Sequence, residues 1–256
     1  MYNTTRFTIE KNGLTLNCLQ YSGDTSCVKS VILALHGFAG HMDSNAIKKM
    51  AERFIEEDAG TVLMSFDLPG HGTDKERLSL ELCDRYTTAA VEYLREQYEG
   101  AELILYGTSF GGYLALKYLN EHPDVFSLCI LRCPAVRMYE TLHNDLLTDA
   151  ERKKLEEGGV IEIGFDRVVE IRQDYLDDLN DHPVFDASYK KYADRILILQ
   201  GLCDETVKCE EVIEFARKNG IRLVLSKDAD HRFLAGNSLA ESLEECVKFL
   251  GSRLGS

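Results

Sequence analysis

The chain has 256 residues, of which 45% are hydrophobic, and this length is enough for one large domain with a full core. Its 43 acidic and 29 basic side chains give a net charge of −14, so we expect no basic surface for a nucleic acid or an anionic membrane. The longest apolar runs, such as Val31–Leu35 and Ile196–Leu199, are far shorter than the roughly 20 residues that cross a bilayer.

The N-terminal residues Met1–Glu10 lack the apolar centre of a secretory signal, so we expect a cytoplasmic protein. In that setting the eight cysteines are expected to be free thiols, several of them buried. Cys203 and Cys209 are too far apart for a CxxC pair, and no Cys/His pattern typical of zinc is present. We therefore expect no metal site.

Taken in chain order, Arg6–Ile9 and Leu14–Tyr21 flank an Asn12-Gly13 turn and predict a β-hairpin. Short apolar runs then alternate with segments of helical periodicity. The predicted strands are Ser30–Leu35, Thr61–Phe66, Leu103–Tyr106, Ser127–Leu131, Ile196–Gln200 and Arg222–Ser226. The predicted helices are Asn45–Glu57, Leu78–Tyr98, Gly112–Asn120, Glu210–Asn219 and Leu239–Leu250. This alternation indicates an α/β fold with a doubly wound, mostly parallel sheet and an antiparallel edge.

The alternation is interrupted between Arg137 and Asp186. These residues contain no apolar strand of the same kind and are expected to be helix or loop, for example helices over Asp149–Glu157 and Asp166–Leu179. We interpret residues 137–186 as an inserted cap, or lid, and residues 1–136 and 187–256 as the core domain.

A nucleophile is predicted at Ser109, within Gly107-Thr108-Ser109-Phe110-Gly111. A predicted strand precedes this G-x-S-x-G sequence and a helix follows it, which is the context in which a serine lies exposed on a sharp turn. The glycines allow the close approach of strand and helix, and the helix N-terminus favours developing negative charge.

His231 is the predicted general base, because it follows the late strand Arg222–Ser226, and catalytic groups gather at the carboxyl edge of an open sheet. Asp204, just after the strand Ile196–Gln200, is the predicted acid that accepts the Nδ1 proton of His231. Glu205 is the main alternative and Asp228 a weaker one.

The Gly-rich turn His36–Gly40 follows the strand Ser30–Leu35. Two backbone N–H groups must face the oxyanion of an acyl-transfer intermediate, and we expect Phe38 and Phe110 to supply them. The turn Asp67–Gly72 is interpreted as structural, because Pro and Gly shape it. The histidines and the aspartate of these two turns match no zinc spacing.

The motifs HGFAG (36–40), DLPGHG (67–72), GTSFGG (107–112), GLCDETV (201–207) and DADHRF (228–233) occur in this order. With them, nearly the whole chain resembles the α/β-hydrolase superfamily. Within it the chain is most similar to bacterial cinnamoyl or feruloyl esterases and to monoacylglycerol-lipase-like enzymes. The resemblance implies ester hydrolysis through an acyl-enzyme, no cofactor, a lid after the sixth strand, and Phe38 and Phe110 as oxyanion donors. Thr108, where many of those esterases have His, and Lys208, where Pro is frequent, depart from the pattern.

The expected substrate is a small-molecule carboxylic ester with a small or aromatic acyl group. A peptidase or thioesterase on the same triad, and a non-catalytic ligand-binding protein on this scaffold, are the alternatives. Residues 137–186 hold 14 acidic and 6 basic side chains. If these residues line the mouth of the pocket, their negative charge should favour neutral over anionic ester substrates. Four aromatic residues in the segment are candidates for the acyl site: Tyr139, Phe165, Tyr175 and Phe185.

Overall fold

The computed structural model describes residues 2–164 and 167–254. Eight strands form one sheet, in the spatial order β1 (Asn3–Lys11), β2 (Leu14–Ser22), β4 (Thr61–Phe66), β3 (Ser30–Leu35), β5 (Glu102–Thr108), β6 (Leu128–Arg132), β9 (Ile196–Gly201) and β10 (Arg222–Ser226). The six strands from β4 to β10 in this order pair in parallel. The predicted doubly wound, mostly parallel sheet is confirmed.

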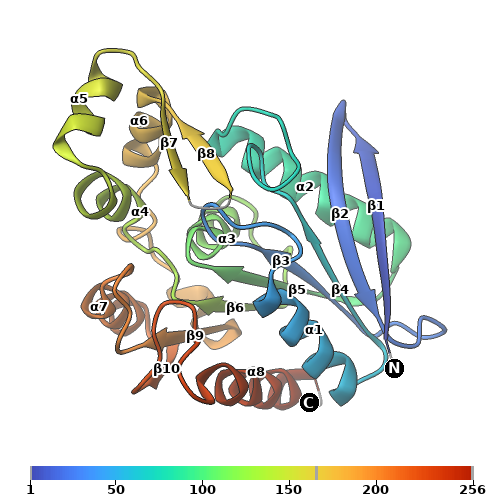
Figure 1. The fold of residues 1–256 in the computed structure, drawn as a ribbon. Coiled ribbons are helices and arrows are strands. Elements are labelled where there is room, and N and C mark those ends of the chain that lie inside the picture. The colour runs from blue at the N-terminus through green and yellow to red at the C-terminus, as the bar shows by residue number, and fades with distance from the viewer. Residues whose placement is uncertain (1, 165–166, 255–256) are drawn as a thin grey trace.

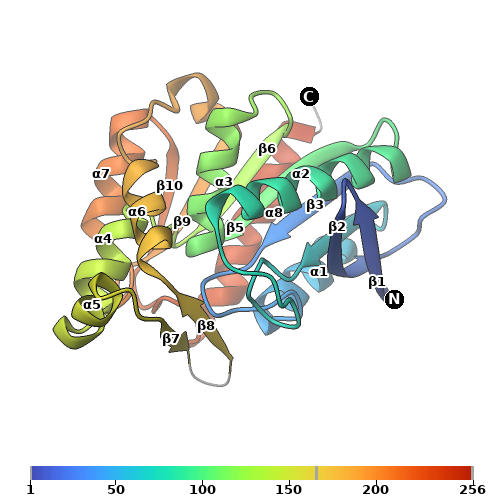
Figure 2. The same ribbon diagram turned by 90° about the horizontal axis from the view of Figure 1, so that it is seen from above.

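Helices cover both faces of this sheet (Figures 1 and 2). On one face lie α1 (Asn45–Glu57) and α8 (Ser238–Leu254), and on the other α2 (Leu80–Gln97), α3 (Phe110–Glu121) and α7 (Cys209–Asn219). Every residue of β3, β4, β6 and β9 is buried, because a sheet covered on both faces exposes neither set of side chains. This is why their sequences are continuously apolar.

The N-terminal hairpin adds the antiparallel edge. Lys11 pairs with Leu14 across the two-residue turn, and Asn12 and Gly13 have φ values of 55° and 73°. Two consecutive positive φ values are what the tight hairpin turn requires, and Asn-Gly adopts them readily. Strand β2 then pairs antiparallel with β4 and joins the hairpin to the parallel sheet.

The segment 137–186, which we call the cap segment, lies between β6 and the short helix η2 (Lys190–Arg195). Its elements are α4 (Met138–Glu140), η1 (Thr141–Leu146), α5 (Asp149–Glu156), β7 (Ile161–Gly164), β8 (Val168–Ile171) and α6 (Gln173–Asp181). Figure 1 shows them gathered on the side of the molecule away from the β1–β2 hairpin. Its assignment as a separate lid subdomain stays a prediction.

One expectation for the cap segment is wrong: it contains strands, because β7 and β8 form an antiparallel hairpin. The helix predicted over Asp166–Leu179 begins at Gln173. Apolar and other residues alternate along these strands, with Ile161, Val169 and Ile171 buried, which is the pattern of a half-buried strand. Continuous apolar runs mark strands covered on both faces, so they do not reveal half-buried strands with this period-two pattern.

The cap segment packs on the core through apolar and polar contacts. Tyr175, Leu176 and Leu179 of α6 belong to the same hydrophobic cluster as the α2–α3 face of the sheet. At its edges, Lys208 forms an ion pair with Asp145 at 2.7 Å, and Asp174 pairs with Arg77. These contacts connect the cap to α2 on one side and to α7 on the other.

All eight cysteines are unpaired, and six of them are buried, as expected for free thiols. Within residues 2–164 and 167–254, no helix has the length and apolar character needed to span a bilayer.

The contact between α3 and β3 sets a stability prediction. A Cβ placed on Gly111 would lie 2.2 Å from the carbonyl oxygen of Leu35 and 2.6 Å from that of His36. We expect Gly111→Ala to lower the free energy of unfolding by about 3 kcal/mol, since rigid backbone atoms must move. Gly251→Ala is the matched control. An added Cβ there meets nothing within 4 Å, so this change should raise stability by about 0.5–1 kcal/mol. Urea denaturation of both variants measures the difference, and equal effects would contradict the packing argument.

Candidate active site

Ser109 occupies a strained turn between β5 and α3. Its φ of 54° and ψ of −116° lie outside the regions that ordinary residues favour. The chain can turn this sharply because Gly107 has no side chain. A Cβ at this position would lie 2.4 Å from the carbonyl oxygen of Gly111 and would clash with it. The hydroxyl-bearing residue is thereby placed at the N-terminus of α3, partly exposed, as the G-x-S-x-G sequence predicts.

Asp204 and His231 lie together at the carboxyl ends of β9 and β10. The Nδ1 atom of His231 is 2.8 Å from Oδ2 and 3.0 Å from Oδ1 of Asp204. The Asp204 side chain is fully buried, and that of His231 is 15% exposed. A buried carboxylate in this position fixes Nδ1 as the protonated ring nitrogen and leaves Nε2 as the base.

Burial alone would raise the pKa of Asp204. The hydrogen bond and the charge of His231, with further bonds from the Val207 N–H and the Cys133 thiol, nevertheless hold it below its ordinary value. Oδ1 also accepts hydrogen bonds from the N–H groups of Thr206 and Val207, at 2.9 and 2.8 Å. Asp204 is therefore ionised near neutral pH, as a residue that orients and supports an imidazolium must be.

The competing acids lie elsewhere. Glu205 and Asp228 are exposed, and Asp230 accepts a hydrogen bond from the backbone N–H of Leu234. His122, at the C-terminus of α3, stacks on Tyr118 and pairs with Asp84. Of the carboxylates weighed from the sequence, Asp204 is thus the one in hydrogen-bonding contact with His231.

Ser109 and His231 are not joined by a hydrogen bond within 3.5 Å in this structure, as far as the described side chains show. Hydrogen bonds between a nucleophile and its base often reach their short geometry when substrate binds. The two residues nevertheless share one edge of the sheet, because β5, β9 and β10 run in the same direction. The assignment of Ser109, His231 and Asp204 as a triad stays a prediction.

The turn after β3 lies directly beside the nucleophile. A Cβ on Gly37 would be 3.3 Å from the Cβ of Ser109 and 3.9 Å from its Oγ. The rings of Phe38 and Phe110 contact each other edge-on, with centroids 5.7 Å apart. The Phe110 N–H is in the first turn of α3, where N–H groups have no intrahelical acceptor. The assignment of the Phe38 and Phe110 N–H groups as oxyanion donors stays a prediction.

Sequence reasoning missed the side chains that hold this turn. The Nε2 atom of His36 accepts a hydrogen bond from the N–H of Leu68, so its Nδ1 carries the proton and donates to the Gly37 carbonyl. Burial, and to a lesser extent the neighbouring His71, lowers the pKa of His36 well below its ordinary value. The ring therefore stays neutral, and its Nε2 can accept the hydrogen bond. Asp67 accepts hydrogen bonds from the N–H groups of Met42 and Thr73. The occurrence of His36 and Asp67 directly after neighbouring strands was the available signal.

His71 lies behind the two phenylalanines. Its ring stacks on Phe110 at 6.1 Å and meets Phe38 edge-on at 5.5 Å. Nδ1 bonds to the Pro69 carbonyl, and burial lowers the pKa of the ring. His71 is therefore a neutral packing group, in keeping with the structural interpretation of residues 67–72.

The described aromatic candidates for the acyl site have different neighbours in the structure. Tyr175 is buried with its ring 6.4 Å from that of Phe110, next to the nucleophile. Phe185 is buried beneath the guanidinium of Arg137, and Tyr139 stacks on His143. Phe165 lies outside the described residues. Their role in substrate binding stays a prediction.

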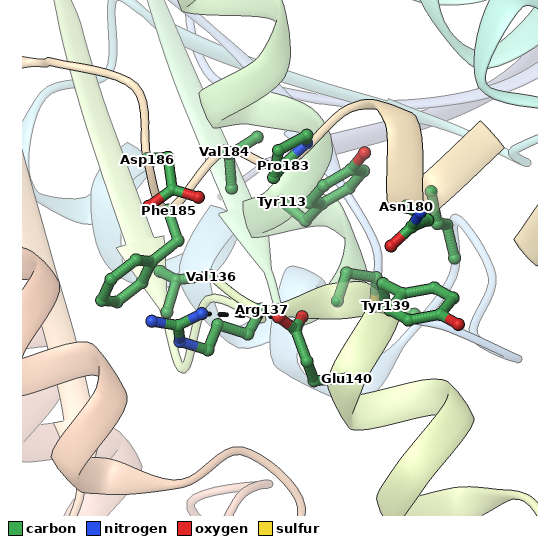
Figure 3. A pocket seen from close by; sticks show the side chains of 12 residues that line it. Tyr113, Val136, Arg137, Tyr139, Glu140, Asn180, Pro183, Val184, Phe185 and Asp186 are labelled. Carbon is green, nitrogen blue, oxygen red and sulfur yellow. Dashed lines mark hydrogen bonds and ion pairs between the residues drawn. The ribbon is translucent and has the colours of Figure 1, made fainter. Parts of the chain in front are cut away.

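Tyr139 and Phe185 line the same small pocket, at the base of the cap segment. Figure 3 shows them on opposite sides of it, with Arg137 and Glu140 between them. The pocket has a volume of about 40 Å³, enough for water but not for an ester, and neither Ser109 nor His231 lines it.

Comparison with known proteins adds family information. A family model described as serine aminopeptidase, S33, matches residues 26–156, which include the turn His36–Gly40 and Ser109. The mouse acylamino-acid-releasing enzyme is 23% identical over 96% of this chain, but the chain spans 28% of that protein's length. Monoacylglycerol lipase abhd6-A of Xenopus laevis is 33% identical over a match that covers 44% of this chain and 33% of the lipase's own length.

Solved structures share the fold at low identity. Est1E from Butyrivibrio proteoclasticus, with ferulic acid bound, superimposes with a TM-score of 0.81 and 20% identity, over 98% of this chain and all of that one. The α/β-hydrolase domain-containing protein 10 from mouse gives a TM-score of 0.73 at 16% identity, covering 97% and 99% of the two chains.

The contact between Asp204 and His231 generates a prediction. Asp204→Asn preserves the shape of the side chain but no longer fixes the tautomer of His231, and we expect kcat to fall by about 10³–10⁴-fold. Glu205→Gln, at an exposed neighbouring position, is the matched control and should change kcat little. Steady-state kinetics on an activated ester measure both variants. If Glu205→Gln causes the loss and Asp204→Asn does not, the acid is wrongly assigned.

Proposed function

The chain belongs to the serine aminopeptidase S33 family of α/β-hydrolases, and on that basis we propose that this serine hydrolase cleaves carboxylic esters through an acyl-enzyme on Ser109. The observation that carries the proposal is the buried Asp204–His231 hydrogen bond at the same edge of the sheet as the strained Ser109 turn.

In the proposed reaction, Ser109 Oγ attacks the ester carbonyl while Nε2 of His231 takes the hydroxyl proton. The backbone N–H groups of Phe38 and Phe110 stabilise the oxyanion of the tetrahedral intermediate. His231 then returns the proton to the departing alkoxide, which leaves as the alcohol. A water molecule, deprotonated by His231, attacks the acyl-enzyme, and collapse of the second intermediate releases the acid and restores the Ser109 hydroxyl.

We further propose that the substrate is a small molecule with a small or aromatic acyl group. The solved structure of Est1E with ferulic acid bound, on the same fold, supports an aromatic acyl group. The buried Tyr175 ring packs against Phe110, the residue that follows Ser109 in the sequence. Nothing in the reaction requires a metal or a cofactor, and we propose neither.

Amide hydrolysis is the second candidate function. The family description names an aminopeptidase, and the mouse relative is named an acylamino-acid-releasing enzyme. The triad chemistry is the same for esters, thioesters and amides, so the pocket decides among them. The distinguishing measurement is kcat/KM for an ester, a thioester and an amide that share one acyl group.

The nucleophile is tested by Ser109→Ala. We expect kcat on the preferred ester to fall by roughly 10⁴–10⁶-fold, because the acyl-enzyme can no longer form. A fluorophosphonate probe should label Ser109 in the native protein and label nothing in the variant. Ser127→Ala, at a serine on the opposite end of the sheet before β6, is the control and should leave labelling intact. Full labelling of Ser109→Ala would disprove the proposed mechanism.

Charge near the site gives a second prediction. The acidic excess of the cap segment should disfavour anionic substrates, and salt should screen the effect. For a matched pair of esters, one neutral and one bearing a free carboxylate, we expect the neutral ester to have the higher kcat/KM at low salt and the difference to narrow at high salt.

Arg167 offers a variant that sharpens this test. The β7–β8 hairpin borders the turn His36–Gly40, because a Cβ on Gly164 would lie 3.2 Å from the Cβ of Ala39. The positive charge of Arg167 helps to lower the pKa of His36 and of His41. Removing this cation in Arg167→Gln should widen the preference for the neutral ester at low salt. A preference that ignores salt, or a higher kcat/KM for the anionic ester, would contradict the electrostatic proposal.

A further inference from the structure

The turn that follows β6, residues 132–135, touches the nucleophile through its backbone. The N–H of Ser109 donates to the carbonyl of Arg132 at 3.0 Å, and the N–H of Ala135 donates to the carbonyl of Ser109 at 3.1 Å. Both polar backbone groups of Ser109 are therefore bonded to this one turn, which we call the β6 turn. Pro134 packs closely against Gly112: a Cβ added to Gly112 would lie 2.8 Å from the Cβ of Pro134.

The same turn reaches Asp204 through Cys133. The Cys133 Sγ, a carboxylate oxygen of Asp204 and a ring nitrogen of His231 all lie within 4.8 Å of one another. Cys133 is fully buried, its φ is +45°, and its N–H donates to the Leu199 carbonyl of β9 at 2.8 Å. A non-glycine residue holds a positive φ when its surroundings require it. Here that backbone conformation accompanies a side chain placed beside the carboxylate.

The Cys133 thiol is suited to donate to that carboxylate. Burial, and then the charge of Asp204, raise the pKa of Cys133 well above its ordinary value, so the sulfur keeps its proton. The other hydrogen bonds to Asp204 come from its own strand and loop, including one from Nε2 of Gln200 at 3.1 Å, and from His231. Among the described residues, Cys133 thus brings the β6 turn, which is bonded to Ser109, to within 4.8 Å of the Asp204 carboxylate.

Arg132 extends the contact to the histidine loop. Its Nη2 donates to Oγ1 of Thr108 at 3.1 Å, and its guanidinium lies 5.5 Å from the ring centroid of Phe233, two residues after His231. Arg132 is 6% exposed, so these contacts form in the interior. One short turn therefore contacts all three loops that carry the candidate triad.

We propose that the β6 turn sets the position of the Asp204–His231 pair relative to Ser109, with Cys133 as the positioning residue whose thiol lies within 4.8 Å of the Asp204 carboxylate. The inference rests on the proposed function of Ser109, Asp204 and His231. It assigns Cys133 no contact with substrate and no covalent step. Removing the thiol should let Asp204 and the imidazole reorient, which affects the proton transfer more than the binding of the ester.

The test compares two buried cysteines of the same strand region. Cys133→Ala should lower kcat by about three- to tenfold and leave KM within about twofold, as expected for a lost hydrogen bond that acts during proton transfer. Cys133→Ser keeps a donor and should recover most of kcat. Cys133→Gly also removes the thiol but accepts the positive φ, so it serves if the alanine variant folds poorly.

Cys129→Ala is the matched control. Cys129 is 1% exposed on β6, but it faces the α2–α3 side of the sheet, whereas Cys133 faces the α1–α8 side. This variant loses a similar buried side chain without touching Asp204, so its stability should fall while kcat stays unchanged. Urea denaturation of every variant separates stability from catalysis.

A readout independent of turnover is the NMR resonance of the His231 Nδ1 proton. We expect it to move in Cys133→Ala and Cys133→Gly and to keep its native position in Cys129→Ala. If the resonance and kcat are the same in all three variants as in the native protein, the positioning role is disproved. Failure of the proposed function has a different signature: the native protein would hydrolyse no ester and Ser109 would resist the fluorophosphonate probe, while the resonance would still report on Cys133.

Discussion

The backbone of Ser109 holds a φ and ψ combination that costs about 1–3 kcal/mol, and the surrounding structure must supply that energy. Gly107 and Gly111 remove the side chains that would otherwise prevent the turn, and the β6 turn bonds both polar backbone groups of Ser109. Because these supports come from β3, β5 and β6 together, the strained turn exists when the parallel sheet is fully formed. The geometry of the candidate site is therefore a property of the whole sheet.

The sheet also explains how residues far apart in sequence come to share one edge. Parallel strands present all their carboxyl ends on the same side, so the loops after β3, β5, β9 and β10 converge there. The candidate oxyanion turn, His36–Gly40, is held in place by buried, neutral His36 and by Asp67, both of which accept hydrogen bonds from backbone N–H groups. Rigid backbone donors arranged before substrate arrives need no reorganisation during the reaction, which is the basis of their contribution to catalysis.

The cap segment is attached differently. Its apolar residues join the main core through α6, whereas its edges are fixed by exposed ion pairs, such as Lys208 with Asp145, that contribute little to stability. The pocket at its base is too small for a substrate. A cap with an apolar anchor and weak polar edges can change its edge contacts at low energetic cost while the sheet stays constant.

The sequence by itself determined the α/β class, the antiparallel hairpin, and the position of most strands and helices, because continuous apolar runs, an Asn-Gly turn and helical periodicity are local signals. It also favoured Asp204 over Glu205 as the acid, just after the predicted strand Ile196–Gln200, and the structure places Asp204 in hydrogen-bonding contact with His231. The β7–β8 hairpin was missed, because its strands are short and half-buried and alternate instead of running continuously apolar.

Tertiary structure alone decided which side chains support the site. Arg132 and Cys133 follow the predicted strand Ser127–Leu131 and belong to no motif in the sequence. Their positions beside Thr108, Phe233 and Asp204 arise from pairing between β6, β5 and β9. The contacts of Phe185 with Arg137 and of Tyr175 with Phe110 likewise follow from how the cap segment packs, which composition does not encode. Sequence motifs record the chemistry of a residue and its local turn, whereas long-range packing determines what that residue touches.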